Sequence, residues 1–186
     1  MSLQKLPREF YQRETTEVAK SLLGQHLVHR LHGIERVGKI VEVEAYLGEH
    51  DLAAHSSKGL TKRTAVMFGP PGFAYVYLIY GKYHCFNVVT GNGAAVLIRA
   101  LEPVLNITER TQGPGLLCQA MMIDKQQNAH DLLSDDLFIS EGDAMHHSII
   151  EAPRIGVHYA KHWAHKPLRF YIDGNAFVSK LFINRK

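Results

Sequence analysis

The sequence predicts an α+β protein with one compact domain, in which a mainly antiparallel β-sheet is flanked by helices. Segments typical of strands follow one another through the middle of the chain with turns between them, which favours antiparallel pairing. Segments typical of helices are few and lie outside this run. The length of 186 residues and the apolar content of 46% suffice for one hydrophobic core.

The first half of the chain opens with a predicted helix. Between Thr15 and Leu23 the apolar residues have helical spacing, and Gly24 suits the position that ends the helix. The strings HLVHRL and ERVGKIVEVEAYL then predict two strands that meet at Gly33 as a hairpin. Residues 49–72 are polar, small and rich in turn formers, so we expect a long ordered loop there.

The second half is predicted to add more strands and another helix. Strands are expected at AYVYLIY, YHCFNVV and AAVLIRALEP. The turn in TQGPG is expected to open a helix from about Leu116. In the last third, further strands are predicted at LFISEG, RIGVHY, PLRFYIDG and FVSKLF, with loops between them.

Composition narrows the location and the chemistry of the protein. No run approaches the roughly 18 apolar residues of a membrane span, and the N-terminus lacks the apolar region of a secretory signal. We therefore expect an intracellular protein without a membrane partner. Cys85 and Cys118 lie in apolar strings, which favours buried free thiols over a disulfide. The net charge of +3 permits a nucleic-acid partner without requiring one.

One predicted strand carries two carboxylates on a single face. In KIVEVEAYL, strict alternation places Ile40, Glu42, Glu44 and Tyr46 together, whereas the intervening aliphatic residues form the face expected to cover the core. The plain alternative is a solvated face that bears two surface acids. The other strands help to decide between these interpretations.

Neighbouring strands supply an arginine and aromatic rings. Arg99 interrupts the aliphatic string AAVLIRALEP, and we expect it to pair with Glu42 or Glu44, since an isolated buried charge is costly. Tyr75 and Tyr77 share one face of their strand. Aromatic rings with nearby cations suit the stacking of nucleic-acid bases.

Tyr80 stands at the tip of a predicted hairpin, in LIYGKYHCFN. Gly81 is an expected turn residue, because glycine reaches positive φ without steric cost. A tyrosine beside it is unexpected, because a turn tip faces water and offers a large ring nothing in its own domain to pack against. Its partner is therefore expected to lie outside the protein.

The sequence resembles the alkyladenine (3-methyladenine) DNA glycosylases. The matching blocks extend from about Phe10 to Ser179 in the order VEVEAYLG, LAAHS, MFGPPGFAYVYLIYGKYHCFNVV, VLIRALEP, GPGLLCQAM, PRIGV and KPLRFYI. The resemblance implies a single glycosylase domain, residues 1–186, built around a curved antiparallel sheet from which a DNA-intercalating β-hairpin projects. The implied reaction is excision of damaged purines from double-stranded DNA by hydrolysis of the N-glycosidic bond.

The resemblance also implies which residues handle the attacking water. Glu44 would be the general base that positions and deprotonates it. Arg99 would help to hold the water, and the main-chain carbonyl of Ile155 would be a third contact. Water is the nucleophile in this scheme, so no lysine Schiff base and no strand nicking are expected.

Other residues would bind the base and enter the duplex. Tyr46 would stack on one face of a flipped base, with His55 and Tyr77 on the other. Asn87 would line the pocket floor, where its amide would crowd the 2-amino group of a normal guanine. Tyr80 would fill the space that the extruded nucleotide leaves, because a base inside a duplex must be flipped out to be reached.

Cationic residues are expected to contact the DNA backbone. Phosphate contacts would come from cations of the long loop and the hairpin tip: Arg63, Lys62, Lys58 and Lys82. The alternative is that these four are ordinary surface cations. We expect a monomer with no cofactor and no metal. It would act where the DNA is, in the cytoplasm and nucleoid of a bacterium or the nucleus of a eukaryote.

Two other classes of function compete with a glycosylase. A non-catalytic protein that binds DNA damage would use the same scaffold, and loss of Glu44 or Arg99 would favour it; both residues are present. A metal hydrolase would draw a zinc set from His50, Asp51 and His55 with a neighbouring glutamate. No HExxH or other tight ligand spacing supports that set.

Overall fold

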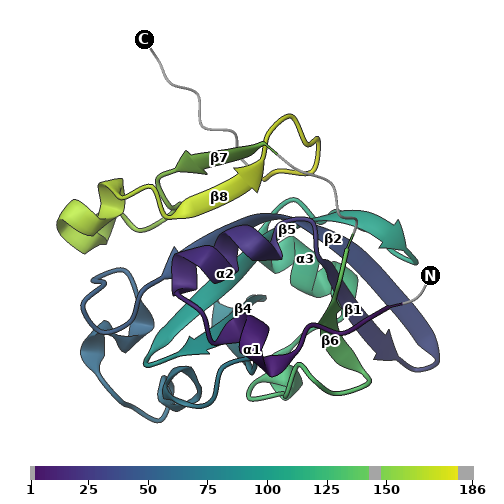
Figure 1. Ribbon diagram of the computed structural model, residues 1–186, viewed down its shortest axis with the longest axis horizontal. Helices are drawn as coiled ribbons and strands as arrows, with labels where there is room; N and C mark the ends of the chain where they lie inside the picture. The colour runs from purple at the N-terminus through teal and green to yellow at the C-terminus, as the bar shows by residue number, and fades with distance from the viewer. Residues whose placement is uncertain (1–2, 143–147, 180–186) are drawn as a thin grey trace.

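The strands pair into an eight-stranded sheet in which every described pairing is antiparallel. The computed structural model describes residues 3–142 and 148–179 (Figure 1). The strands are β1 (His26–Leu31), β2 (Ile34–Tyr46), β3 (Ala74–Ile79), β4 (Tyr83–Gly91), β5 (Ala94–Leu105), β6 (Leu137–Ser140), β7 (Ile149–Ala152) and β8 (Arg169–Ile172). Their order is β3-β4-β5-β2-β1-β6, while β8 pairs with residues 42–44 of β2 and with β7.

Helices cover this sheet and connect its strands. The described elements are α1 (Arg8–Tyr11), α2 (Thr15–Leu22), α3 (Pro114–Met121) and the 3-10 helices η1 (His55–Lys58), η2 (Ala65–Phe68), η3 (Lys125–Gln127) and η4 (His158–His165). None of the helices in the described ranges is long and apolar enough to cross a membrane. The α+β class and the mainly antiparallel sheet predicted from the sequence are confirmed.

The sheet is curved because its two longest strands are bulged. Strand β2 has 13 residues and β5 has 12, and they pair along most of their length. Their register shifts between Val37 and Gly38 and again between Ile40 and Val43. Bulges of this kind bend a strand and increase its twist. The paired strands therefore sweep across the molecule as a curl rather than as a flat layer (Figure 1).

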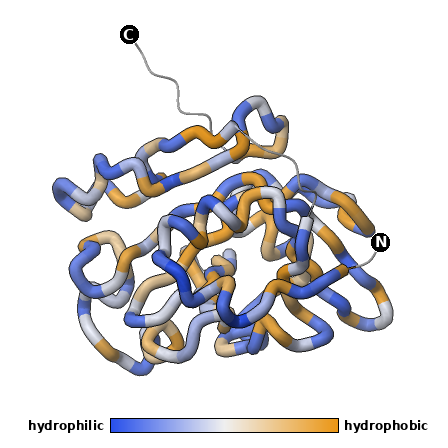
Figure 2. Tube along the Cα trace, viewed as in Figure 1, coloured by the Kyte–Doolittle hydropathy of each residue, from blue (hydrophilic) through white to orange (hydrophobic). Residues whose placement is uncertain are grey.

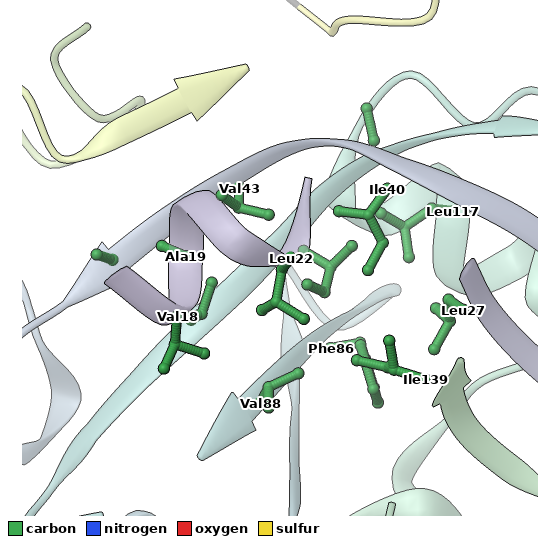
Figure 3. Packing of buried hydrophobic residues seen from close by; sticks show 14 of the residues in the cluster. Val18, Ala19, Leu22, Leu27, Ile40, Val43, Phe86, Val88, Leu117 and Ile139 are labelled. Carbon is green, nitrogen blue, oxygen red and sulfur yellow. The ribbon is translucent and has the colours of Figure 1, made fainter. Parts of the chain in front are cut away.

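The main core lies between this sheet and helices α2 and α3. Val18 and Leu22 of α2, Leu117 of α3, Val43 of β2 and Phe86 of β4 are fully buried in one cluster (Figure 3). Each such side chain contributes about 1.5–3 kcal/mol through burial. Figure 2 shows hydrophobic and hydrophilic segments distributed along the whole chain, and every residue of β5 from 94 to 101 is buried, so the middle of the sheet is covered on both faces.

Local sequence signals account for helix α2 and for the first hairpin. The carboxylate of Glu14 accepts the main-chain N–H groups of Thr16 and Glu17, which caps α2. After the helix, Gly24 has a φ of 87°. The β1–β2 turn contains His32 and Gly33 with φ values of 52° and 75°, as a tight hairpin turn requires. Both elements were predicted at these places.

Several predicted elements differ from the structure. In RIGVHY, residues 154–157 form a loop and His158 and Tyr159 begin η4, so there is no strand; Arg154 is engaged in a buried ion pair instead of a sheet ladder. In FVSKLF, residues 177–179 are not a strand, and the rest lies outside the described residues. Helix α1 and strand β7 were not predicted, and the expected loop at residues 49–72 contains η1 and η2.

The bulge in β2 also changes which side chains share a face. Ile40 joins Val41 and Val43 in the core, although strict alternation placed it with the carboxylates. Glu42 and Glu44 are both 0% exposed, so the interpretation of their face as solvated is wrong. Strand β8 pairs directly with residues 42–44 and helps to close this part of the sheet.

Candidate active site

A cavity of about 220 Å³ opens where β2, β3, β4 and β5 meet the loops around residues 53–55 and 155–159. The residues predicted to hold the water, to bind the base and to enter DNA all line it: Glu44, Tyr46, His55, Tyr77, Tyr80, Asn87, Arg99 and Ile155. The structure thus brings together side chains that lie up to 111 positions apart in the chain. Their roles depend on how each is held.

Glu44 is a fully buried charged residue that lines the cavity together with Arg99. Its Oε1 accepts the main-chain N–H of Ile155 at 2.8 Å and lies 3.3 Å from Nη1 of Arg99. Its Oε2 accepts the hydroxyl of Tyr46 at 2.8 Å. These donors compensate a carboxylate that has lost its hydration. The predicted pairing of Arg99 is confirmed with both acids, because its Nε also lies 3.2 Å from Glu42.

Tyr46 is fixed at both ends. Its hydroxyl is bound to Glu44, and the guanidinium of Arg154 lies 4.7 Å from its ring centroid. Burial, and then the charge of Glu44, raise the pKa of Tyr46 well above 10. The hydroxyl therefore stays protonated and remains a donor to the carboxylate, while the ring is held in place as one wall of the cavity.

His55, Tyr75 and Tyr77 form a second aromatic wall. The ring centroids of His55 and Tyr77 are 4.5 Å apart, and Nδ1 of His55 lies 2.9 Å from the hydroxyl of Tyr75. Burial and, after it, the nearby cations Arg63 and Lys58 lower the pKa of His55 to about 4. At neutral pH this wall is therefore uncharged.

Asn87 and Cys85 line the cavity from strand β4. The side-chain N–H of Asn87 donates to the carbonyl of Tyr75 at 3.0 Å, which fixes the direction of the amide. Burial raises the pKa of the Cys85 thiol. Cys85 and Cys118 are both buried free thiols, as predicted.

Tyr80 is 91% exposed at the tip of the β3–β4 hairpin, yet it also borders the cavity. Tyr80 and Gly81 have left-handed φ values of 52° and 63°, and with Lys82 they connect the paired residues Ile79 and Tyr83. For tyrosine this conformation costs about 1–2 kcal/mol. The turn therefore holds a large ring in water at an energetic cost, which agrees with the exposure predicted from the sequence.

The predicted phosphate-binding cations are not among the residues that line the cavity. Lys58, Lys62, Arg63 and Lys82 are all exposed. The guanidinium of Arg63 lies 5.5 Å from the ring centroid of Tyr77, which places this cation beside the aromatic wall. Their contact with DNA stays a prediction.

Some cavity residues were not predicted. Met67, Val157 and Tyr159 line the cavity, and two of these follow Ile155 in the segment that was predicted as a strand. Tyr75 was placed correctly on the face of Tyr77 but was given no role. The alternation of β3 was the signal for Tyr75. Tyr159 lies in η4, in a segment that was predicted as a strand, so no sequence signal placed it at the cavity.

The alternative zinc set is not assembled. Both carboxylate oxygens of Asp51 are bound by Arg154, at 2.6 and 2.9 Å. The ring of His50 packs against Trp163 instead. Across residues 3–142 and 148–179, no three histidine, cysteine, aspartate or glutamate side chains are grouped so that they could hold a metal ion. The Asp51–Arg154 pair is structural and anchors the loop that carries Ile155.

A compensated buried carboxylate beside aromatic walls is typical of a ligand-binding cavity and can receive a flat ring. The family model of methylpurine-DNA glycosylase matches residues 9–176. The chain therefore belongs to the methylpurine-DNA glycosylase family, DNA-repair enzymes that act on alkylated purines, as the resemblance of its sequence blocks implied.

Individual relatives agree with this membership. A protein of Legionella pneumophila (strain Corby) named "Putative 3-methyladenine DNA glycosylase" is 64% identical over 182 residues, which cover 96% of this chain and 100% of that protein. A protein of the same name from Anaeromyxobacter sp. (strain Fw109-5) is 52% identical, with 95% of this chain and 93% of the relative covered. Another from Myxococcus xanthus (strain DK1622) is 52% identical, with 94% and 93% covered.

Proposed function

We propose that this protein is a monofunctional glycosylase of base-excision repair. It flips a damaged purine, alkylated or deaminated, out of duplex DNA and hydrolyses the N-glycosidic bond with an activated water, leaving an abasic site. The observation that carries the proposal is Glu44, a fully buried carboxylate bound to Arg99 and Ile155 at an aromatic cavity. The protein acts as a monomer, within the cell and on its DNA, and residues 1–186 form one catalytic unit.

Glu44 is the general base. Glycosidic cleavage passes through an oxocarbenium-like state, so a carboxylate close to the sugar both stabilises the developing positive charge and orients the water. Arg99 and the carbonyl of Ile155 hold that water against Glu44. The main-chain N–H of Ile155 already donates to Glu44, so the carbonyl of Ile155 is the main-chain group that we propose contacts the water.

The cavity binds one flipped base. Its volume of about 220 Å³ is below the roughly 300–1,000 Å³ of typical small-molecule sites, which suits a single base. Tyr46 stacks on one face of the base, and His55 with Tyr77 on the other. Asn87 excludes normal guanine, because its fixed amide crowds the exocyclic 2-amino group. No lysine is among the residues that line the cavity, in keeping with water as the nucleophile.

The hairpin and the surrounding cations bind the duplex. Tyr80 enters the DNA and stacks on the neighbouring base pairs, which offsets the few kcal/mol that unstacking costs. The phosphate contacts come from four exposed cationic side chains: Lys58, Lys62, Arg63 and Lys82. These contacts supply affinity without sequence preference.

The test is base excision from a defined duplex. The protein is incubated, with chelator and without added metal, with end-labelled DNA that carries one hypoxanthine or one etheno-adenine, and alkali then reveals abasic sites. We expect alkali-dependent cleavage by the wild type. Glu44→Gln should reduce it by about 10²- to 10⁴-fold, the usual contribution of a general base. Glu109→Gln, which changes an exposed acid, is the matched control.

Each other outcome assigns a different role. Equal excision by Glu44→Gln would remove Glu44 as the base and leave a glycosylase. Tight binding of the lesion duplex without excision, also with alkylated purines, would identify a protein that only binds damage. Activity that the chelator abolishes would identify a metal hydrolase.

A further inference from the structure

Glu42 is a second fully buried carboxylate that the reaction described above does not use. It is 0% exposed, precedes Glu44 by two residues on β2, and does not line the cavity. Its Oε1 is bound by Nε of Arg99 at 3.2 Å and by Nη1 of Arg169 at 2.9 Å. Its Oε2 accepts the main-chain N–H of Ser179 at 2.7 Å. A buried charge with this many donors is held in one geometry.

The first contact of Glu42 determines the direction of Arg99. In the guanidinium of Arg99, Nε pairs with Glu42 and Nη1 pairs with Glu44, so the two carboxylates contact different edges of one planar group. Because the fork of an arginine is rigid, fixing one edge fixes the direction of the other. Glu42 therefore sets where Arg99 meets the Oε1 atom of Glu44.

The second contact reaches the loop on the other side of Glu44. Arg169 binds Glu42 through Nη1 and donates from Nε to the carbonyl of Pro153 at 3.0 Å. Two residues later, the N–H of Ile155 donates to Glu44 at 2.8 Å. Glu42 is thus connected, through two different arginines, to both of the donors that contact the Oε1 atom of Glu44.

We propose that Glu42 is the positioning residue of this active site, which aligns Arg99 and the residue 153–155 loop with Glu44. The inference rests on the proposed function and deepens it. Glu42 touches neither base nor water. It acts by holding the two groups that hold the catalytic carboxylate and the attacking water, so its effect falls on the rate of bond cleavage rather than on the binding of DNA.

The charges of these two glutamates and two arginines allow an experiment to distinguish a positioning role of Glu42 from a role that only balances charge. Glu42 and Glu44 carry two negative charges, and Arg99 and Arg169 carry two positive charges, all on side chains exposed by less than a tenth. Glu42→Gln leaves one uncompensated positive charge. The double variant Glu42→Gln/Arg169→Met restores neutrality without restoring the contacts, and replacing both members of a buried pair is far less destabilising than removing one.

The experiment measures single-turnover excision of etheno-adenine from duplex DNA at increasing enzyme concentration, together with thermal unfolding. For Glu42→Gln we expect the maximal rate to fall by about 10- to 100-fold, as when a group that orients a metal ligand is lost. The half-saturating enzyme concentration should stay unchanged. The double variant should recover the unfolding temperature of the wild type but not its rate.

The alternative results are distinct. Recovery of both stability and rate in the double variant would show that Glu42 only balances charge, and would overturn its positioning role. A wild-type rate in Glu42→Gln, or a change confined to the half-saturating concentration, would overturn it as well. In all of these cases the wild type still excises the base. A wild type that excises nothing would instead overturn the proposed function, and the role of Glu42 with it.

Discussion

Two residues of the cavity have protonation states that burial determines. Tyr46 keeps its proton because burial and Glu44 raise its pKa, and His55 stays neutral because burial lowers its pKa to about 4. A protonated histidine at this wall would repel a purine that alkylation has made cationic. In the proposed reaction, two uncharged aromatic walls would accept both cationic and neutral bases, and the charges left in the cavity are those of the paired Glu44 and Arg99.

The lowered pKa of His55 predicts how stability depends on pH. In the unfolded chain this imidazole titrates near 6.5, and in the folded protein near 4. Between these values the unfolded state binds more protons than the folded state. The contribution of His55 to stability is therefore present above about pH 6.5 and is lost as the pH falls towards 4. One such proton gives a slope of at most ~1.4 kcal/mol per pH unit.

Urea unfolding of the wild type and of His55→Gln at several pH values measures this contribution. The variant should lose less stability than the wild type as the pH falls through that window, whereas His165→Gln, at an exposed position, should behave like the wild type. Equal slopes for the wild type and His55→Gln would mean that His55 titrates normally in the folded protein.

At the scale of elements, we predict that the tip of the β3–β4 hairpin matters for excision but not for the stability of the fold. Tyr80 is 91% exposed and makes a strained turn, so Tyr80→Ala should leave the unfolding temperature nearly unchanged. Excision from duplex DNA should nevertheless fall by about 10- to 100-fold, because a few kcal/mol of unstacking are no longer offset. Tyr80→Phe, which keeps the ring, should retain most of the rate.

A single-stranded oligonucleotide with the same lesion provides the control for this prediction. In a single strand the flipped nucleotide leaves no gap in a duplex that Tyr80 would have to fill. The Tyr80→Ala variant should therefore excise the base from it almost as fast as the wild type. An equal loss of rate on single and double strands would assign Tyr80 to the cavity, which it also borders, instead of to the duplex.

The elements also show what the sequence could predict. Helix α2 and the hairpin turns at Gly33 and Gly81 were predictable because their signals are local: a helical apolar spacing and residues that reach positive φ. The pairing of Arg99 followed from the cost of an isolated buried charge. The site residues came from the resemblance of motifs, and the cavity brings them together.

Contacts between distant parts of the chain were not predictable in this way. The loop at Arg154 has the alternation of a strand, but Arg154 pairs with Asp51, 103 positions away, and no local pattern records that. The bulge near Ile40 likewise depends on how β2 meets β5. The burial of Glu42 depends on Arg169 and on the return of the chain at Ser179, so its position appears only in three dimensions.

At the scale of the whole molecule, we predict that binding to DNA depends on a small number of cations. The net charge is only +3, so the general positive field is weak and we expect most of the affinity to come from local phosphate contacts. Each phosphate contact contributes about −0.9 to the slope of log K against log salt concentration. Contacts from Lys58, Lys62, Arg63 and Lys82 together therefore predict a slope of roughly −3 to −4.

Measuring the affinity of the Glu44→Gln protein for lesion duplex between low and moderate salt tests this arrangement without catalysis. Adding Lys62→Gln should make the slope shallower by about one contact and weaken binding to lesion-containing and undamaged duplex alike, since phosphate contacts carry no sequence information. Arg30→Gln is the matched control, because its guanidinium already pairs with Glu35 at 2.6 Å. A slope that Lys62→Gln leaves unchanged would place the DNA backbone on another side of the cavity, away from the loop that carries Lys58, Lys62 and Arg63.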